Sequence, residues 1–188
     1  VKAIFHRTID TGIQHGTVTV LVDREILDDG RGSPASHTDY AFEVTTYRVD
    51  GVYTDHRRPE SVCFTASLEE DLKRRDFTIN AMAYNPEQGV IDIFGGQEDL
   101  EKGIIRCVGE ASERFDEDAL RILRAVRFAA QLDFVIEDQT REAMRDQAKF
   151  LKDISAERIC TELTKMIVSK HPERLEEAYE LGLTNIFL

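Results

Sequence analysis

The sequence predicts an α+β protein in which a mixed β-sheet with helices is followed by an all-α region. In the first half, short runs rich in β-branched and aromatic residues indicate strands, as at residues 17–22 and 42–49. From Ser112 onward, apolar residues recur at the spacing of one helix face. This change of period predicts two domains, residues 1–95 and residues 96–188.

Further strands and turns are expected in the first half. Residues 61–65 and 90–94 are short runs suited to strands, and Gly95-Gly96 closes the second of them. Asp50-Gly51 indicates a turn. The polar stretch from Asp28 to Asp39 contains glycine, proline and serine, so we expect a flexible loop there.

Helices are expected on both sides of the domain boundary. Ser67 and Glu70 have the spacing of a capping box, and Asp76 can cap a helix over residues 77–84. The next predicted helix opens at Glu117 and carries an apolar stripe, formed by Ala119, Ile122, Leu123, Val126 and Ala130. Three more amphipathic segments follow, at residues 140–151, 155–169 and 172–181.

The composition favours a soluble, cytoplasmic protein. The chain has 188 residues, 41% of them hydrophobic, which is enough to bury a core. No apolar run approaches the ~20 residues that span a bilayer, so no membrane partner is expected. Cys63, Cys107 and Cys160 are isolated in the sequence, and we expect buried free thiols rather than a disulfide or a zinc site.

Positive charge is concentrated in two short segments of an acidic chain. The formal net charge is −12, yet arginines cluster at positions 74, 75, 121, 124 and 127. We therefore expect a local basic pocket that binds one nucleotide, rather than a long RNA-binding surface.

Asp118, Arg121, Arg124 and Arg127 follow one another at three-residue steps, which places them along one ribbon of a helix. One interpretation is a solvated face with ion pairs from Glu117 or Asp118 to Arg121. The other is base recognition, because a carboxylate accepts hydrogen bonds and a guanidinium donates them. This pair matches cytosine and adenine and excludes uracil and guanine, at about 1–3 kcal/mol for each mismatched buried group.

Two strings connect this pattern to a known family. Residues 74–84 (RRDFTINAMAY) and 117–127 (EDALRILRAVR) closely resemble motifs of class II tRNA nucleotidyltransferases, the CCA-adding enzymes, and of the related bacterial poly(A) polymerases. Residues 11–20, 43–48, 92–96 and 154–159 resemble the same family. The resemblance implies that residues 1–95 are part of a nucleotidyltransferase head and that residues 96–188 form a helical neck.

The resemblance also implies substrates and roles. CTP and ATP would be the nucleotides and the 3′ end of tRNA the acceptor. Asp118 and Arg121 would read the base, Arg124 and Arg127 would lie around the nucleotide, and Arg75 would contact it. Capping and helix packing explain Asp76 and Asn80 at least as well as direct contact does.

The metal site of the family is incomplete in this sequence. Nucleotidyl transfer uses metal ions, usually Mg²⁺, held by carboxylates. The resemblance places the family's metal-binding D-x-D pair upstream of Val1. Asp116 and Asp118 do not replace it, because residues i and i+2 of a helix point about 200° apart. Glu43 is a candidate third carboxylate, with a solvent-facing strand residue as the equal alternative.

We therefore expect an N- and C-terminally truncated piece of a template-independent RNA nucleotidyltransferase that is inactive alone. CCA addition is the first hypothesis. A poly(A) polymerase and a non-catalytic nucleotide- or RNA-binding module are the alternatives. The sequence leaves open the oligomeric state, a division of CC- and A-addition between two proteins, and the origin of the Asp28–Asp39 loop.

Overall fold

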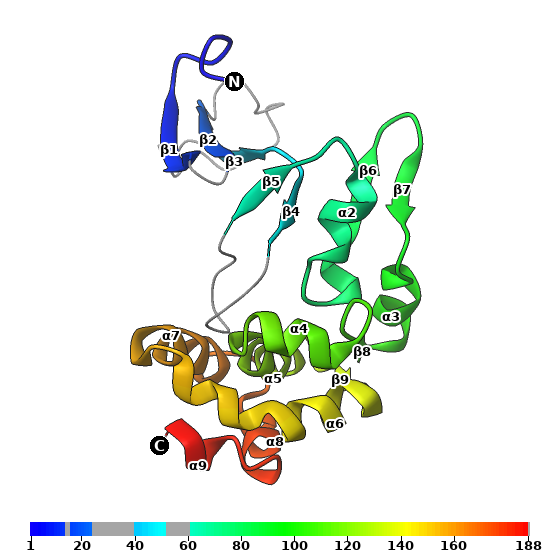
Figure 1. Ribbon diagram of the computed structural model, residues 1–188, viewed down its shortest axis with the longest axis vertical. Helices are drawn as coiled ribbons and strands as arrows, with labels where there is room; N and C mark the ends of the chain where they lie inside the picture. The colour runs from blue at the N-terminus through cyan, green and yellow to red at the C-terminus, as the bar shows by residue number, and fades with distance from the viewer. Residues whose placement is uncertain (14–15, 24–39, 52–60, 188) are drawn as a thin grey trace.

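The computed structural model of the protein describes residues 1–13, 16–23, 40–51 and 61–187 (Figure 1). It confirms the α+β class, with strands in the first half and helices in the second. The predicted loop at Asp28–Asp39 lies outside the described residues. Within the described part of the chain, no helix is long and apolar enough to cross a membrane.

The N-terminal strands form a three-stranded antiparallel sheet in the order β1-β2-β3. Its strands are β1 (Thr8–Gly12), β2 (Thr17–Val22) and β3 (Tyr40–Thr45). The predicted strand at 42–49 is divided, because β4 (Arg48–Asp50) leaves this sheet and pairs with β5 (Val62–Phe64).

A second hairpin and two short helices connect the strands to the helical array. They are α2 (Leu68–Lys73), the 3₁₀ turn η2 (Thr78–Asn80), β6 (Met82–Asn85), β7 (Gly89–Asp92) and α3 (Gly96–Lys102). Ser67 caps α2 as predicted, since its side chain accepts a hydrogen bond from the backbone N–H of Glu70.

The predicted helix over residues 77–84 is wrong. Phe77 has an extended backbone, a short 3₁₀ turn follows, and β6 pairs with β7. Tertiary contacts override the local preference: Phe77 is fully buried in edge-to-face contact with Phe128, and the Thr78 hydroxyl donates to Asp99 at 2.6 Å.

The helix α3 was not predicted, because Gly95-Gly96 resembles a stop signal. In the structure Gly95 adopts a left-handed conformation (φ 77°) and α3 begins immediately after it. The carboxylate of Asp92 accepts hydrogen bonds from the backbone N–H groups of Gly96 and Gln97, both at 2.8 Å. A side chain at Gly96 would come within 2.3 Å of the carbonyl oxygen of Thr78, so α3 packs directly against η2.

The second half is a helical array, as predicted. Its elements are α4 (Ala111–Glu117), α5 (Leu120–Leu132), α6 (Asp138–Gln147), η3 (Ala148–Asp153), α7 (Ala156–Ile167), η4 (Pro172–Arg174), α8 (Leu175–Glu180) and α9 (Thr184–Phe187). A parallel pair of two-residue strands, β8 (Ile104–Ile105) and β9 (Val135–Ile136), lies among them.

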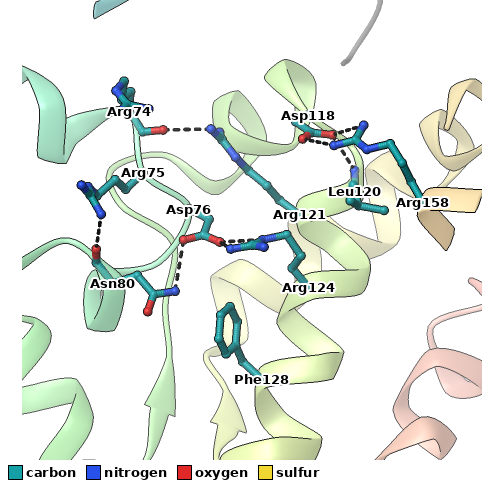
Figure 2. Close-up of a pocket in the computed structure, with 10 residues that line it drawn as sticks. All are labelled: Arg74, Arg75, Asp76, Asn80, Asp118, Leu120, Arg121, Arg124, Phe128 and Arg158. Atoms are coloured by element: carbon teal, nitrogen blue, oxygen red, sulfur yellow. Dashed lines mark hydrogen bonds and ion pairs between the residues drawn. The ribbon is translucent and has the colours of Figure 1, made fainter. Parts of the chain in front are cut away.

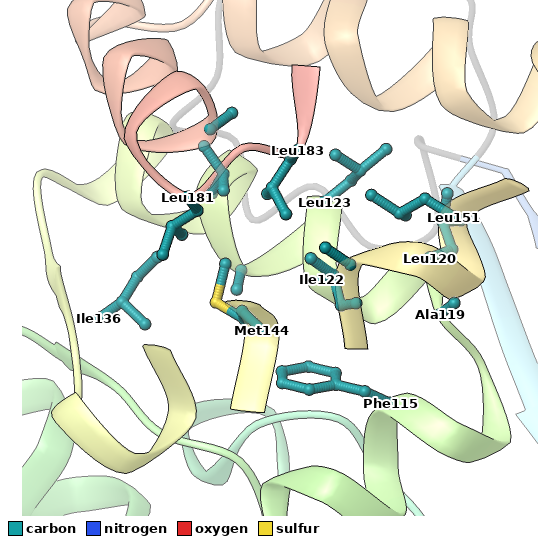
Figure 3. Close-up of a cluster of buried hydrophobic side chains, with 14 of the residues drawn as sticks. Phe115, Ala119, Leu120, Ile122, Leu123, Ile136, Met144, Leu151, Leu181 and Leu183 are labelled. Atoms are coloured by element: carbon teal, nitrogen blue, oxygen red, sulfur yellow. The ribbon is translucent and has the colours of Figure 1, made fainter. Parts of the chain in front are cut away.

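The main hydrophobic core lies in this array and is centred on α5 (Figure 3). All five residues of the predicted apolar stripe are fully buried, which confirms the face of α5 that packs inward. Phe115 of α4, Met144 of α6 and Leu183 surround it. Because this face of α5 packs into the core, the opposite, polar side of α5 faces the segment that follows α2.

The three cysteines are free, as expected, but only Cys107 is buried. Burial raises the pKa of the Cys107 thiol to about 12. The predicted burial of Cys63 and Cys160 is wrong, since both are exposed.

Candidate nucleotide-binding site

A cavity of about 590 Å³ lies where the segment 74–80 meets α5 and the N-terminal turn of α7 (Figure 2). This volume is within the usual range for small-molecule sites. Its lining contains five arginines and two aspartates, which leaves a formal charge of +3 in a chain of net charge −12. The lining residues are Arg74, Arg75, Asp76, Asn80, Asp118, Leu120, Arg121, Arg124, Phe128 and Arg158. The two arginine-rich strings of the sequence thus meet in one basic pocket.

Asp118 lies between two helices rather than within one. The helix α4 ends at Glu117 and α5 begins at Leu120, while Asp118 has an extended backbone (φ −144°, ψ 101°). The predicted continuous helix from Glu117 is therefore wrong. The break lets the Asp118 carboxylate accept a hydrogen bond from the backbone N–H of Leu120 at 3.1 Å.

Arg158 of α7 is the ion-pair partner of Asp118. Its Nη2 donates to Oδ2 of Asp118 at 2.8 Å, and its Nη1 to Oδ1 at 3.3 Å. A carboxylate has about four lone-pair sites, so these contacts orient Asp118 and still leave Oδ2 acceptor capacity beyond its bond to Arg158. Local sequence reasoning missed Arg158 as a pocket residue, although it lies at the start of an amphipathic helix and within residues 154–159, which resemble the tRNA nucleotidyltransferase family.

Arg121 is buried, so the interpretation as a solvated face is wrong at this position. The predicted ion pair with Glu117 is confirmed. In addition, Nη1 donates to the carbonyl oxygen of Arg114 at 3.0 Å, and Nη2 donates to that of Arg74 at 2.8 Å. The guanidinium is thereby held in one orientation at the edge of the pocket.

Arg124 joins α5 to the segment that follows α2. Its Nε donates to Oδ2 of Asp76 at 2.8 Å, and its Nη2 bonds the same oxygen. The other oxygen of Asp76 accepts from the backbone N–H of Phe77 at 2.9 Å and from Nδ2 of Asn80 at 3.3 Å. Asp76 therefore organises the pocket instead of capping a helix.

Arg75 is the more exposed arginine on the other side of the pocket. Its Nη1 donates to the carbonyl oxygen of Asn80 at 3.3 Å, and its Nη2 to Asp71 at 3.2 Å. Burial alone would raise the pKa of Asp71, but hydrogen bonds from Arg74, from the backbone N–H of Arg48 and from Arg75 outweigh it and lower that pKa. Asp71 is thus a fixed anion that orients both neighbouring arginines.

Arg127 is directed toward α7 and does not line the pocket. Its Nε pairs with the buried Glu162, its Nη1 donates to Gln131 at 2.7 Å, and its guanidinium lies 3.8 Å from the centre of the Phe128 ring. Burial lowers the pKa of Arg127, and the charge of Glu162 opposes that shift. Arg127 thus contacts the pocket residue Phe128 but does not itself line the cavity, and its role in nucleotide binding stays a prediction.

Glu43 lies on β3, opposite Thr19 of β2, and its side chain is exposed. Among the described residues, no group of three or more histidine, cysteine, aspartate or glutamate side chains could hold a metal ion. The role of Glu43 as a third carboxylate stays a prediction.

The fold and the pocket define an α+β protein in which a strand-rich part and a helical array share one basic pocket. Residues 1–106 match the family described as "Poly A polymerase head domain", and residues 133–188 match "Probable RNA and SrmB- binding site of polymerase A". The first match covers more than half of the sequence. The chain belongs to the poly(A) polymerase head domain family.

Similar proteins are CCA-adding enzymes. The chain is 51% identical to the CCA-adding enzyme of Leuconostoc mesenteroides over 183 residues, covering 97% of this chain and 41% of the relative. It is 52% identical to that of Lactiplantibacillus plantarum over 172 residues, covering 92% of this chain and 39% of the relative. The chain thus spans about two-fifths of the length of these relatives.

Solved structures agree with the sequence relatives. The Bacillus stearothermophilus CCA-adding enzyme in complex with CTP matches 96% of this chain and 40% of its own, with 43% identity and a TM-score of 0.80. The Thermotoga maritima CCA-adding enzyme complexed with tRNA matches 94% of this chain and 37% of its own, with 26% identity and a TM-score of 0.68.

Proposed function

We propose that this chain supplies the nucleotide-binding pocket of an enzyme that adds CMP and AMP to the 3′ end of tRNA without a nucleic-acid template. The observation that carries the proposal is the single basic pocket that gathers Asp118 and Arg121 with Arg75 and Arg124. In this proposal residues 1–95 belong to the head and residues 96–188 to the neck. Similarity to CCA-adding enzymes, including one bound to CTP, supports it.

Base selection rests on Asp118 and Arg121. Oδ2 of Asp118 can accept a hydrogen bond from the exocyclic amino group of cytosine or adenine. Arg121, held by Glu117 and two backbone carbonyl groups, is a pre-oriented donor beside it. Uracil and guanine present a carbonyl oxygen to the carboxylate, which leaves buried groups unpaired and costs about 1–3 kcal/mol each.

Arg75 and Arg124, which lie on either side of Asp76 in the pocket, bind the phosphate groups of the nucleotide. Guanidinium groups form strong, charge-assisted hydrogen bonds with phosphate oxygens. Arg75 and Arg124 are only partly buried, with 38% and 32% of their side chains exposed, so an incoming nucleotide can reach them. These contacts do not depend on the base, and we expect them to contribute equally to all four nucleotides.

In the whole protein, Mg²⁺ would activate the attacking 3′-hydroxyl and polarise the α-phosphate. Among the described residues, no group of three or more histidine, cysteine, aspartate or glutamate side chains could hold that ion. We therefore propose that the described residues bind and select the nucleotide, and that this chain alone has negligible transferase activity.

A poly(A) polymerase is the second candidate, because the matching family carries that description. The two differ in the nucleotide that the whole protein incorporates. Incubation of the whole protein with tRNA and CTP alone separates them: incorporation of C indicates CCA addition, and its absence together with ATP incorporation indicates poly(A) synthesis.

The selection step is tested by binding of CTP, ATP, UTP and GTP to this chain, measured by calorimetry. Asp118→Asn should reduce the preference for CTP over UTP by about tenfold, because the amide replaces one acceptor with a donor. Asp116→Asn, an exposed change two residues away, is the matched control and should leave the preference unchanged. An unchanged CTP preference in Asp118→Asn would exclude Asp118 as the base reader.

A further inference from the structure

Arg114 of α4 is a buried cation that the pocket itself does not explain. It is 8% exposed and does not line the cavity. Its Nη1 donates to the carbonyl oxygen of Lys73 at 2.7 Å, and its Nη2 donates to Glu117 at 2.6 Å. A buried arginine with such partners connects segments that are distant in sequence, here the end of α2 and the end of α4.

Arg121 makes the neighbouring contact in the same arrangement. Its Nη2 bonds the carbonyl oxygen of Arg74, the residue that follows Lys73. Glu117 lies between the two arginines, with Oε1 accepting from Arg114 and Oε2 from Arg121. Arg121 also donates to the backbone carbonyl of Arg114. The two guanidinium groups, Glu117 and two consecutive carbonyl groups thus form one network, which we call the clasp.

The clasp has a physical reason. The last carbonyl groups of a helix lack partners within the helix and carry partial negative charge. Guanidinium donors at the end of α2 satisfy them. Two neighbouring buried cations would repel each other, and the carboxylate of Glu117 bonded to both offsets that repulsion. Removal of one member therefore changes the position of the others.

We propose that Arg114 is a positioning residue that sets the orientation of Arg121, and through it the selection of the base. The inference rests on the proposed role of Arg121 in base recognition. Arg114 and Arg121 bond consecutive carbonyl groups and share one carboxylate, so loss of Arg114 leaves Glu117 with a single cation and allows the Arg121 guanidinium to reorient. Arg75 and Arg124 lie outside the clasp, so phosphate binding is retained.

The first test follows Arg121 directly, without any nucleotide. In a ¹⁵N–¹H spectrum of the chain, the Nε–H signal of Arg121, assigned with Arg121→Lys, should shift or broaden in Arg114→Met. Arg141→Met is the matched control, because Arg141 pairs with Glu180 away from the pocket. An unchanged Arg121 signal in folded Arg114→Met would overturn the proposal.

The second test measures selectivity. Arg114→Met should reduce the preference for CTP over UTP by about tenfold, while the affinity for inorganic tripolyphosphate stays within about twofold. Arg114→Lys keeps one charged donor, should remain folded if the methionine variant does not, and should recover part of the preference. An equal loss of affinity for CTP, UTP and tripolyphosphate would indicate a merely structural role and overturn the proposal.

The two tests also separate this inference from the proposed function. If the unmodified chain binds CTP and UTP equally, base selection by this pocket is wrong, and the link from Arg114 to selectivity falls with it. The Arg121 signal still decides whether Arg114 orients that side chain. If the unmodified chain prefers CTP and Arg114→Met keeps that preference, the proposed function stands and the inference fails.

Discussion

Two regions that meet at α5 use the same residue type in different ways. In the pocket region, Arg124 pairs with Asp76 and 32% of its side chain is exposed. At the α5–α7 interface, three residues further on, Arg127 pairs with Glu162 and only 9% of its side chain is exposed. The sequence motif presents both arginines as equivalent, yet only the first faces the cavity.

The difference shows that the surrounding elements decide what an arginine does. Arg124 faces the segment that follows α2, where it bonds Asp76 and lines the cavity. Arg127 faces α7, which covers it and supplies a buried carboxylate. The two arginines still share one neighbour, since both guanidinium groups lie over the Phe128 ring, at 5.4 Å for Arg124 and 3.8 Å for Arg127 from its centre. A buried ion pair and an arginine that lines the cavity therefore lie three residues apart on one helix.

The largest expected effect is at the interface. Arg127→Met removes the closer cation from the buried Glu162 and leaves Lys165 beside it, at 3.1 Å. Breaking a buried ion pair by removing one partner costs about 3–5 kcal/mol. Urea unfolding followed by circular dichroism should show a loss of this size in the free energy of unfolding.

Two controls sharpen this prediction. Arg145→Met changes an exposed arginine of α6 and should cost no more than about 0.5 kcal/mol. The double change Arg127→Met with Glu162→Met removes both charges and should recover most of the lost stability. If Arg127→Met instead left stability unchanged and weakened nucleotide binding, Arg127 would belong to the pocket region after all.

Sequence pattern predicted the helical array well because the signal is local. The apolar stripe of α5 and the amphipathic segments of α6 and α7 follow the period of the helix, and each helix then buries the face that the pattern indicates. Pro172 likewise begins a helical turn, as expected. Such signals need no knowledge of the partner segment.

The errors lie where distant partners decide the structure. Residues 77–84 look helical, but Phe77 packs against Phe128 and β6 pairs with β7. The helix break at Asp118 is invisible locally, because good helix formers flank it. The partner of Asp118 is forty residues away, at Arg158. Of the charged residues that line the pocket, the sequence singled out Arg75, Asp118, Arg121 and Arg124, but it did not show that Asp118 pairs with Arg158.

In the pocket region the effects should be on binding rather than on stability. Arg75→Ala removes a partly exposed guanidinium, while Arg74 continues to neutralise Asp71 at 2.7 Å. We expect about tenfold weaker binding of CTP, ATP, UTP and GTP alike, since phosphate contacts do not depend on the base. Calorimetric titration with all four nucleotides measures this.

Arg75→Ala should reduce the stability of the fold much less than Arg127→Met does. For Arg75→Ala the free energy of unfolding should fall by less than about 1 kcal/mol, because Arg75 is partly exposed and Arg74 still pairs with the buried Asp71. A change in the ratio of the CTP and UTP affinities in Arg75→Ala would contradict phosphate binding as the role of Arg75. A loss of stability as large as that at the interface would remove the distinction between the two regions.

The smallest expected effect is the pH dependence of the stabilisation by Asp71, which pairs with the pocket residues Arg74 and Arg75. Its hydrogen bonds from Arg74, Arg48 and Arg75 lower its pKa below the ordinary value of 3.8, against the opposing effect of burial. A lowered folded-state pKa means that the carboxylate stabilises the fold above the unfolded pKa, and that this stabilisation is lost as the pH falls through the folded pKa. Asp71→Asn should therefore cost about 1 kcal/mol at pH 7. The difference in the free energy of unfolding between the unmodified chain and Asp71→Asn should narrow below about pH 4. A difference that widened on acidification would show that the pKa of Asp71 is raised and that the arginines do not lower it.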